Sequence, residues 1–483
     1  MQTLFRSLGT GAVLACVFAS AHAAVNVTRP VSIQGVETGS VTLVWHTLEP
    51  TDARVEFGAT LEYGRTAEAK ELVREHVVTL SRLTAGETYF YRVRGGGEIL
   101  FEGPEYHFQT LPDKRSTRCR FLAFGDSGKG TAAQFSLVPA LVAAQADFIV
   151  HTGDVIYPSG EAKEFNSKYF QPYKNLIRNT PVWLSLGNHD VMTQDGQPYL
   201  DAFRLPRNDQ DESERYYSFT WGQVHFVILD SNGTISPEEL QWLETDLART
   251  RTLWKVAVFH HPPYSCGMHG SSEYPRNRFA PLFERYGVDL VLNGHDHHYE
   301  RTYPLLQGAV TDSARSEYRN PRGVIYVVTG GGAGPRETST RCGFTAFGLA
   351  ATHFTQVDVE GPRLELKAVH ADGRILDRMS IDKSPASGAG AASANLLPNV
   401  PNPFNPETLV RYALHEPGAV RVGIYNLSGR LVRELVHGEQ PVGQYQVLWN
   451  GRDENGHTVA SGVYVLRLQT SGPPIARKLL LAK

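Results

Sequence analysis

The sequence predicts a mixed α/β (α+β) domain between two small all-β sandwiches. Residues 24–111 alternate apolar and polar side chains in short runs, which is typical of antiparallel strands with one buried face. From about residue 118, apolar strands alternate with helical segments, which indicates a layered α/β structure. Residues 384–395, "SPASGAGAASAN", lose this apolar content before alternating strands return. The 483 residues suffice for roughly two to four domains.

The first all-β domain is assigned to residues 24–112. Its runs "SVTLVWHT", "ARVEFG" and "TYFYRVRG" are separated by turns rich in Gly, Pro and Thr, as expected for a small antiparallel sandwich. The segment "LTAGETYFYRV", with Leu83, Gly86, Tyr89 and Tyr91, resembles the corner of a fibronectin type III domain. A generic β-sandwich is the alternative.

The middle domain is assigned to residues 118–383. Its predicted strands are the runs "RFLAFGD", "DFIVHTGD", "PVWLSLGNHD", "VHFVILD", "WKVAVFHH", "VDLVLNGHDH" and "VIYVVTGGG". Between several of them lie segments with helical spacing, such as "PEELQWLETDLART". In α/β folds ligands bind beyond the carboxyl ends of the strands, so a functional site is expected at those ends.

The first 23 residues are predicted to be a secretory signal peptide. Arg6 precedes an apolar stretch, and Ala21-His22-Ala23 supplies the small residues of a cleavage site. No later segment approaches the ~20 apolar residues of a transmembrane helix, so we expect an exported protein, secreted or held at the cell surface. The net charge of -3, from 47 basic and 50 acidic residues, gives no reason to expect a nucleic acid partner.

Three cysteines remain after the predicted signal peptide, because Cys16 lies within it. An oxidising compartment permits one disulfide and one free thiol among Cys119, Cys266 and Cys342. We favour pairing of Cys266 with Cys342, since both lie in glycine-bearing loops while Cys119 leads directly into a strand. Spacing alone leaves the pairing open.

Side chains that bind metal ions end five predicted strands of the middle domain. In chain order they are Asp126 in "GDSG", Asp154 and Tyr157 in "GDVIY", Asn188 and His189 in "GNHD", His260 and His261 in "HHPPY", and His295 and His297 in "GHDHH". Taken alone, the histidines of "NGHDHHYER" are equally consistent with a polar loop. Their recurrence at successive strand ends predicts a metal centre instead.

The residue types indicate two unlike metal sites that share one ligand. Two cations about 3.5–4 Å apart repel each other and need an anionic bridge, for which Asp154 is the candidate. A hard ion prefers oxygen ligands, and a borderline ion accepts imidazole and amide oxygen. The first kind is supplied by Asp126, Asp154 and Tyr157, and the second by Asn188, His260 and His295.

Tyr157 is the most diagnostic of these residues. A phenol with a pKa of about 10 binds metal only when a strong Lewis acid displaces its proton, and ferric iron is the usual ion that does so. The alternative for Tyr157 is an ordinary tyrosine of the core or of the rim of the site.

The ordered motifs resemble those of the purple acid phosphatases, within the calcineurin-like metallophosphoesterases. The matching positions are Asp126 in GDxG, Asp154 and Tyr157 in GDxxY, Asn188 and His189 in GNH(D/E), His260 before a Pro-containing loop, and His295 and His297 in GHxH. The tail "HYER" and the preceding β-sandwich resemble the plant-type branch. The resemblance, which covers residues 121–303, implies a metallophosphoesterase β-sandwich flanked by helices.

The resemblance also implies the roles of the site residues. Ferric iron would be bound by Asp126, Asp154, Tyr157 and His297, and a divalent ion (Fe, Zn or Mn) by Asp154, Asn188, His260 and His295. His189 and His269, the latter in "CGMHG", match histidines of the family that contact phosphate and assist the leaving group. An ordinary surface histidine is the alternative for His269.

The neighbouring histidines His261 and His298 are expected to be structural. In an extended segment side chains alternate, which would place His295 and His297 on one side and His298 on the other. That alternation would let two nearby imidazoles serve two nearby ions.

The reaction implied by the resemblance is hydrolysis of a small phosphate ester, a phosphomonoester, through direct attack by metal-bound hydroxide. A phosphodiesterase or nucleotide pyrophosphatase of the same superfamily is the alternative, and loops such as "CGMHGSSEYPRNR" control the opening of the pocket that decides between them. A second alternative is a surface adhesion or sorting protein with an inactive middle domain. It predicts a missing ligand, and the sequence retains every ligand position.

The C-terminal unit, residues 396–483, follows a predicted linker at residues 384–395. It resembles the FlgD-like and type IX secretion sorting domains of bacteria through "NPFNPET", "VGIYNLSGRLV", "VLWNGRDENGHTVASGVYVLRL" and "ARKLLLAK". The resemblance implies a bacterial protein that meets a secretion or sorting machinery after its export. A passive accessory β-sandwich is the alternative.

Overall fold

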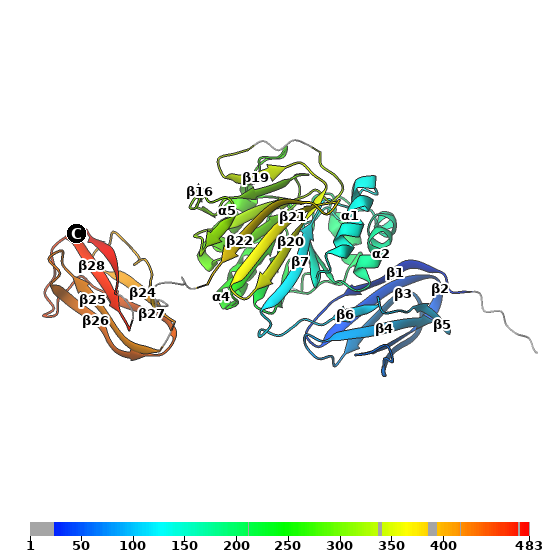
Figure 1. Ribbon diagram of the computed structural model, residues 1–483, viewed down its shortest axis with the longest axis horizontal. Helices are drawn as coiled ribbons and strands as arrows, with labels where there is room; N and C mark the ends of the chain where they lie inside the picture. The colour runs from blue at the N-terminus through cyan, green and yellow to red at the C-terminus, as the bar shows by residue number, and fades with distance from the viewer. Residues whose placement is uncertain are drawn as a thin grey trace, which may run out of the picture. The chain divides into compact units, whose positions relative to one another are not determined.

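The structure is a computed structural model that describes residues 24–210, 212–336, 341–384, 394–415, 417–471 and 474–482 (Figure 1). The predicted signal peptide and most of the predicted linker lie outside these residues. The chain divides into two compact units, Met1–Asp382 and Lys383–Lys483. No helix within the described ranges is long and apolar enough to cross a membrane.

The N-terminal β domain is one antiparallel sheet of six strands. They are β1 (Val27–Gln34), β2 (Ser40–Gly58), β3 (Arg65–Ser81), β4 (Thr88–Gly95), β5 (Glu98–Phe101) and β6 (His107–Gln109). Residues 40–47 and 53–58, predicted as separate strands, belong to the single 19-residue strand β2. Pro50 does not end this strand, because it lies where the pairing with β3 shifts register between His46 and Thr51, a place where a missing N–H is tolerated.

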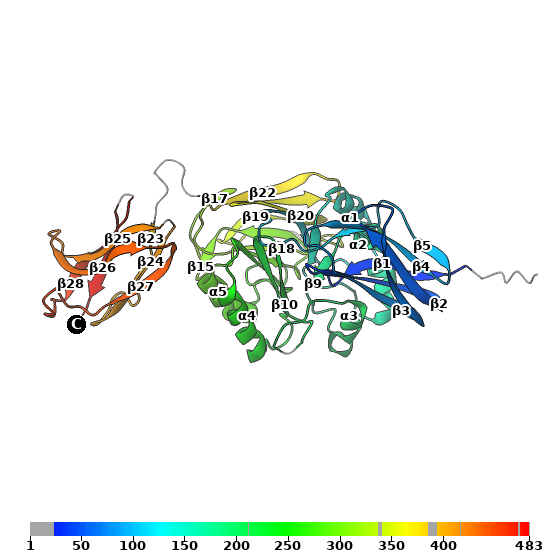
Figure 2. The ribbon, with the colours of Figure 1, turned by 90° about the horizontal axis from the view of Figure 1, so that it is seen from below.

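Two seven-stranded sheets form the middle domain, and both are seen in Figure 2. The first has the order β17 (Glu317–Arg319), β22 (Ile375–Asp382), β21 (Arg363–His370), β20 (His353–Glu360), β7 (Arg118–Phe124), β8 (Phe148–His151) and β9 (Val182–Leu184). The second has the order β10 (Tyr217–Trp221), β11 (Val224–Ile228), β12 (Trp254–Val258), β13 (Leu290–Asn293), β18 (Ile325–Thr329), β14 (Tyr299–Thr302) and β19 (Thr345–Leu349). Strands β15 (Leu305–Leu306) and β16 (Ala309–Val310) form a separate hairpin.

The two sheets face each other across an aromatic core. The ring of Phe226 on β11 packs edge to face against Phe121 on β7 and Phe148 on β8, with ring centroids 5.1 and 5.3 Å apart. The next residue on β11, Val227, points to the other face and belongs to a second apolar cluster that includes Trp242 and Phe279 of the covering helices. The predicted sandwich flanked by helices is therefore confirmed.

Helices cover the outer faces of this sandwich, with α1 and α2 on the side away from α4 and α5 (Figure 1). The helices are α1 (Ala132–Ala143), α2 (Gln171–Ile177), α3 (Gln197–Ala202), α4 (Pro237–Arg249) and α5 (Glu273–Tyr286), with short turns at Ala162–Glu164, Asn166–Phe170 and Gln194–Gly196. The predicted helix α4 begins after Ser236, whose side chain accepts the N–H of Glu239. This cap and Pro237 in the first turn are the expected start of a helix.

Parallel pairing brings the functional strand ends together. Strands β7, β8 and β9 are parallel neighbours in the first sheet, and β11, β12, β13 and β18 are parallel neighbours in the second. The residues that follow β7, β8, β9, β12 and β13 therefore gather beyond the carboxyl ends of their strands.

The N-terminal β domain packs directly on the middle domain. The Tyr91 hydroxyl donates to the carbonyl of Arg178 at 2.6 Å, and the side-chain oxygen of Gln34 accepts the N–H of Arg204 at 2.7 Å. One continuous apolar core includes buried side chains of both domains. The two domains therefore form a single structural unit.

The C-terminal unit is an antiparallel β-sandwich with its own core. One sheet contains β23 (Ala394–Leu396), β24 (Thr408–Leu414) and β27 (Gly443–Trp449), and the other contains β26 (Leu431–Gln440), β25 (Gly418–Tyr425), β28 (Gly462–Gln469) and β29 (Ile475–Leu481). Val410, Val422, Trp449 and Leu466 meet in its interior. Its first strand begins at Ala394, inside the segment that the sequence predicts as a linker.

The cysteine pairing that we favoured is confirmed. Cys266 and Cys342 form a disulfide with Cα atoms 6.0 Å apart, a usual separation for such a bond. Cys119 is free and buried in β7.

Candidate metal centre

The predicted ligands follow buried strands in strained turns. Asp126 follows β7, Asp154 follows β8 and His295 follows β13. Their φ angles are 58°, 54° and 70°, in the left-handed region that side chains other than glycine rarely adopt. Such strain costs on the order of 1–3 kcal/mol per residue and is concentrated at functional sites.

Glycines next to these ligands permit close approach of the loops. A Cβ atom on Gly187 would lie 2.1 Å from the backbone nitrogen of Asp154, and one on Gly294 would lie 2.5 Å from Oδ2 of Asp126. Any side chain at either position would push the ligand loops apart. The glycines of "GNHD" and "GHDHH" therefore have a steric role.

Three predicted ligands form a first cluster, the tyrosine group, which consists of Asp126, Tyr157 and His297. The Tyr157 oxygen lies 3.1 Å from Oδ1 of Asp126 and 3.1 Å from Nε2 of His297. Nε2 of His297 lies 3.5 Å from the same Asp126 oxygen. These donor atoms converge as ligands around one ion would.

A second cluster, the asparagine group, consists of Asn188, His260 and His295. The side-chain oxygen of Asn188 lies 3.0 Å from Nε2 of His260 and 2.9 Å from Nδ1 of His295, and the two nitrogens are 3.2 Å apart. Nδ1 of His260 lies 2.9 Å from the carbonyl of Thr152. Because only an N–H can bond to that carbonyl, Nε2 keeps its lone pair toward the cluster.

Asp154 joins the two groups through different oxygens. Its Oδ2 lies 2.7 Å from the Tyr157 oxygen, and its Oδ1 lies 3.5 Å from Nε2 of His260. The side chain is only 2% exposed. A buried carboxylate between two sets of donors is the arrangement that a pair of closely spaced cations requires.

The charge state of these groups suits cation binding. Burial and the neighbouring charge of Asp154 raise the pKa of Asp126 well above its usual range. Burial lowers the pKa of His295 to about 4 and that of His297 to about 3, so both rings are neutral near pH 7. Neutral imidazoles are the form that binds metal, and cations would offset the repulsion between the two carboxylates. The donor set therefore fits a metal centre.

His261 lies close to the asparagine group, although the sequence suggests only a structural role for it. Donor atoms of His260, His261 and His295 all lie within 4.8 Å of one another, as do those of Asp126, Asp154 and His260. The His261 ring lies 4.6 Å from that of His295, and its Nδ1 is 2.9 Å from the Ser231 hydroxyl. It at least supports the His295 ring by direct packing.

The two predicted non-ligand histidines lie beside the donor groups. The ring of His189 is 4.3 Å from that of Tyr157, and its Nε2 is 3.9 Å from Oδ2 of Asp154. The exposed His269 has its ring 4.3 Å from that of His295. The structure therefore brings every predicted site residue to the same end of the sandwich.

The sequence predicts that the segment carrying His295, His297 and His298 is extended. In the structure it is not. Strand β13 ends at Asn293, and the positive φ of His295 turns the chain directly afterwards. The rings of His295 and His297 still face different donor groups. Turn geometry, rather than the alternation of a strand, separates them.

Asp190 is a buried carboxylate at the site that the sequence analysis did not single out. Its Oδ2 accepts the N–H groups of Val155 at 3.0 Å and Gly187 at 2.9 Å, and its Oδ1 accepts that of Ile156 at 3.0 Å. It thereby fastens the loop after β8 to the loop after β9. The only sequence signal for this role is that Asp190 ends the motif "GNHD".

Lys129 is a second residue that the sequence analysis missed. Its Nζ lies 3.0 Å from Nδ1 of His297 and 4.3 Å from the centroid of the Tyr157 ring. Burial and the charge of Arg336 lower the pKa of Lys129 to about 8. A cationic side chain therefore adjoins the tyrosine group.

Known proteins resemble the chain in two of its parts. Residues 119–299 match the model of the calcineurin-like phosphoesterases, and residues 407–473 match that of the FlgD Ig-like domain. Acid phosphatase type 7 of Homo sapiens is 26% identical over 338 residues, which cover 61% of this chain and 75% of the human protein. Purple acid phosphatase 15 of Arabidopsis thaliana is 29% identical over 298 residues, or 54% of each chain. The chain thus spans about half the length of this plant relative.

A solved structure shares the fold. The purple acid phosphatase PPD1 from yellow lupin (Lupinus luteus) seeds aligns with a TM-score of 0.65 over 74% of each chain, at 20% sequence identity. At that identity the likeness concerns the fold alone.

Proposed function

We propose that this chain, which is similar to purple acid phosphatases and matches the calcineurin-like phosphoesterase and FlgD Ig-like models, hydrolyses phosphomonoesters at a centre for two unlike cations. The observation that carries the proposal is the position of Asp154. Its two oxygens face separate donor groups, each of which contains three further side chains. All seven proposed ligands are present, which argues against an inactive middle domain.

The two groups would hold different ions. We propose ferric iron for the tyrosine group with Asp154, because a trivalent ion displaces the proton of a phenol most readily. The asparagine group with Asp154 would hold divalent Fe, Zn or Mn, which accept amide and imidazole ligands. When bound, the ions would supply a water nucleophile of lowered pKa and offset negative charge on the phosphate oxygens.

The two partly exposed histidines would handle the substrate. Nδ1 of His189 contacts the Pro158 carbonyl, which leaves Nε2, 3.9 Å from Oδ2 of Asp154, to contact a phosphate oxygen of the substrate. His269, on the side of the asparagine group, would protonate the oxygen of the leaving group. These roles assign binding to one imidazole and proton transfer to the other.

Metal analysis combined with an activity assay tests this function. We expect the wild-type protein to bind two metal ions per chain and to hydrolyse p-nitrophenyl phosphate. Asp154→Ala should lose metal and at least about 100-fold in activity, because both groups lose their shared ligand. Asp372→Ala, at an aspartate that is 48% exposed, is the matched control. Substoichiometric metal and equal activity in wild type and Asp154→Ala would contradict the proposal.

The ester preference is tested with the bis-ester in parallel. The proposal expects faster hydrolysis of p-nitrophenyl phosphate than of bis(p-nitrophenyl) phosphate. The reverse order would favour the phosphodiesterase alternative over the monoesterase.

We also propose that the protein is exported and sorted. The Cys266–Cys342 disulfide is the kind of bond that persists outside the cytoplasm, and the FlgD Ig-like match supports an extracytoplasmic bacterial module. N-terminal sequencing of the mature protein should begin at Ala24 if the predicted signal peptide is removed. A cytoplasmic, uncleaved chain would contradict this proposal.

A further inference from the structure

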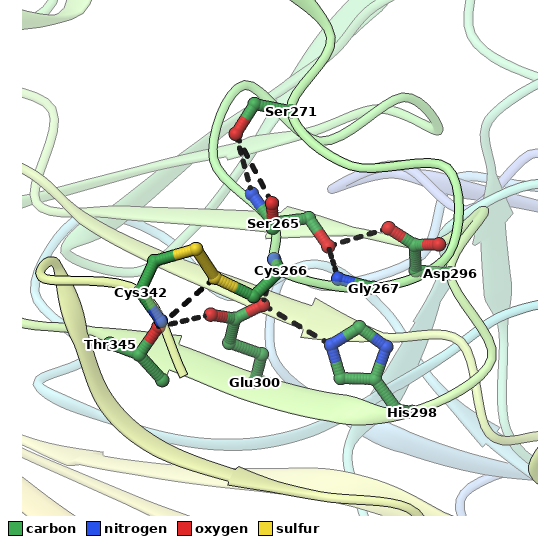
Figure 3. The surroundings of a disulfide bond; sticks show 9 residues. All are labelled: Ser265, Cys266, Gly267, Ser271, Asp296, His298, Glu300, Cys342 and Thr345. Atoms are coloured by element: carbon green, nitrogen blue, oxygen red, sulfur yellow. Dashed lines mark hydrogen bonds and ion pairs between the residues drawn. A yellow bond between two sulfur atoms is a disulfide. The ribbon is translucent and has the colours of Figure 1, made fainter. Parts of the chain in front are cut away.

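The loop that carries His269 is fastened to the segment that carries two proposed ligands (Figure 3). Asp296 lies between His295 and His297 in the sequence, and its carboxylate contacts residues 265–272. Its Oδ1 accepts the N–H of His269 at 2.9 Å, and its Oδ2 accepts the Ser265 hydroxyl at 2.5 Å. One buried carboxylate, only 1% exposed, therefore holds this loop at two points.

The loop also packs tightly on Asp296. The Ser265 hydroxyl oxygen accepts the N–H of Gly267 at 3.0 Å. A Cβ atom on Gly267 would lie 2.3 Å from Cγ of Asp296 and 2.5 Å from Cε1 of His298. Glycine at this position lets the loop lie against both side chains.

A second set of contacts holds the start of the same loop. Oε2 of the buried Glu300 accepts the N–H of Cys266 at 2.7 Å and lies 3.2 Å from Nε2 of His298, while Oε1 accepts the Thr345 hydroxyl at 2.5 Å. The Cys266–Cys342 disulfide ties the loop to the segment that precedes β19 (Figure 3). Glu300 and the disulfide therefore hold the loop at Cys266, whereas Asp296 also holds it at His269.

The arrangement divides the segment by function. His295 and His297 face the donor groups, whereas Asp296, His298 and Glu300 face the loop. Within the described ranges, no side-chain hydrogen bond holds the His269 ring. Its backbone bond to Asp296 is thus the contact that sets its position relative to the adjacent ring of His295.

We propose that Asp296 is a positioning residue that holds His269 where its imidazole protonates the leaving group. The proposal rests on the proposed phosphomonoesterase function and adds a residue that acts through His269. As a water oxygen forms its bond to phosphorus and releases a proton to solvent, the bond between phosphorus and the leaving oxygen breaks, and the leaving oxygen takes the electron pair of that bond and a proton from the His269 ring. The neutral imidazole then regains a proton from water.

Leaving-group dependence distinguishes positioning from a general structural role. Asp296→Ala should keep its metal and lose about 10- to 100-fold in kcat on an alkyl phosphate, whose leaving group needs a proton. On 2,4-dinitrophenyl phosphate, whose leaving group needs none, kcat should change by less than about 3-fold. Asp296→Asn, which keeps an acceptor for the His269 N–H, should recover part of the loss. Ser265→Ala, which keeps the bond from Asp296 to the His269 N–H but removes the Ser265 hydroxyl contacts to Asp296 and Gly267, should fall between Asp296→Ala and wild type.

A double-mutant cycle tests whether Asp296 acts through His269. In a His269→Ala background, Asp296→Ala should cause no further loss on the alkyl phosphate, because nothing is left to position. Additive losses, equal losses on both esters or full activity of His269→Ala would overturn the inference.

Hydrogen exchange of the full-length protein tests the contact without any assay of activity. Amides of residues 265–272 should exchange faster in Asp296→Ala than in wild type or in Asp372→Ala. Unchanged exchange would overturn the inference even if the protein is an active phosphatase. A wild-type protein that hydrolyses neither ester would instead contradict the proposed function, while the exchange experiment would still decide whether Asp296 holds the loop.

Discussion

The two donor groups around Asp154 differ in charge although they share a ligand. The tyrosine group offers a carboxylate, a phenol and one imidazole, whereas the asparagine group offers an amide oxygen and two imidazoles. Anionic donors attract a highly charged cation more strongly than neutral donors do. Because the two oxygens of Asp154 face different donor groups, this difference is what the proposed pair of unlike ions requires.

Both groups nevertheless depend on the same scaffold. The tyrosine group takes Asp126 and Tyr157 from loops after β7 and β8, and His297 from the turn after β13. The asparagine group takes Asn188 from the loop after β9 of the first sheet, and His260 and His295 from the loops after β12 and β13 of the second. Each group therefore forms only when the two sheets pack against each other, and packing defects should affect both.

Chelation should have the largest effect and should separate the two groups. A strong chelator is expected to abolish activity. A weak chelator, added stepwise, should first remove the ion of the neutral asparagine group, since its own donors carry no charge. Metal content and activity measured at each step test this order, and a divalent salt should restore the activity lost in the first step. Loss of both ions in one step would contradict the expected difference in metal affinity between the two groups.

Tyr157→Phe should damage one group and spare the other. Removing the phenol should abolish any visible tyrosinate charge-transfer band and lower activity by at least about 100-fold, while the asparagine group keeps its ion. Absorption spectra and metal analysis measure this. Tyr326→Phe is a suitable control, because the buried Tyr326 hydroxyl has no hydrogen-bond partner within the described structure. A band that survives in Tyr157→Phe would refute the ferric assignment.

Much of this centre could be predicted because ligand side chains directly follow apolar strands in the sequence. The runs that become β7, β8, β12 and β13 are short and apolar, and their polar ends carry the donors. The order of strands in the two sheets and the continuity of β2 past Pro50 could not be read from local pattern, since pairing partners decide both.

The missed residues act through contacts that only folding creates. Lys129 contacts His297, which lies 168 positions later in the sequence, and no local motif predicts this contact. Asp190 accepts three backbone N–H groups, whose directions depend on the turns after β8 and β9. The turn at His295 could not be predicted either, because an extended strand and a turn would both place His295 and His297 near the same edge of the sheet.

Asp190→Asn should weaken both groups equally. The amide of asparagine would present N–H groups to backbone donors, which leaves buried donors unpaired at a cost of about 1–3 kcal/mol in the free energy of unfolding. Affinity for both ions should fall about 10- to 100-fold. Chemical denaturation and metal titration measure these effects, with Asp209→Asn, at a residue whose side chain is 82% exposed, as the control. Selective loss of one ion would show that Asp190 supports only one loop.

Lys129→Met should have the smallest effect and should be confined to the tyrosine group. The Lys129 ammonium lies over the Tyr157 ring and stabilises its π electrons. Removing the charge should raise the energy of those electrons, so the tyrosinate charge-transfer band should move to longer wavelength, with at most about a 10-fold change in activity. Lys129→Arg keeps the charge and should leave the band near its wild-type position. Because the asparagine group lies on the other side of Asp154, its metal affinity should not change in either variant. An equal change in the affinity of both groups would mean that the charge of Lys129 acts on the centre as a whole, and the electrostatic distinction between the groups would then be lost.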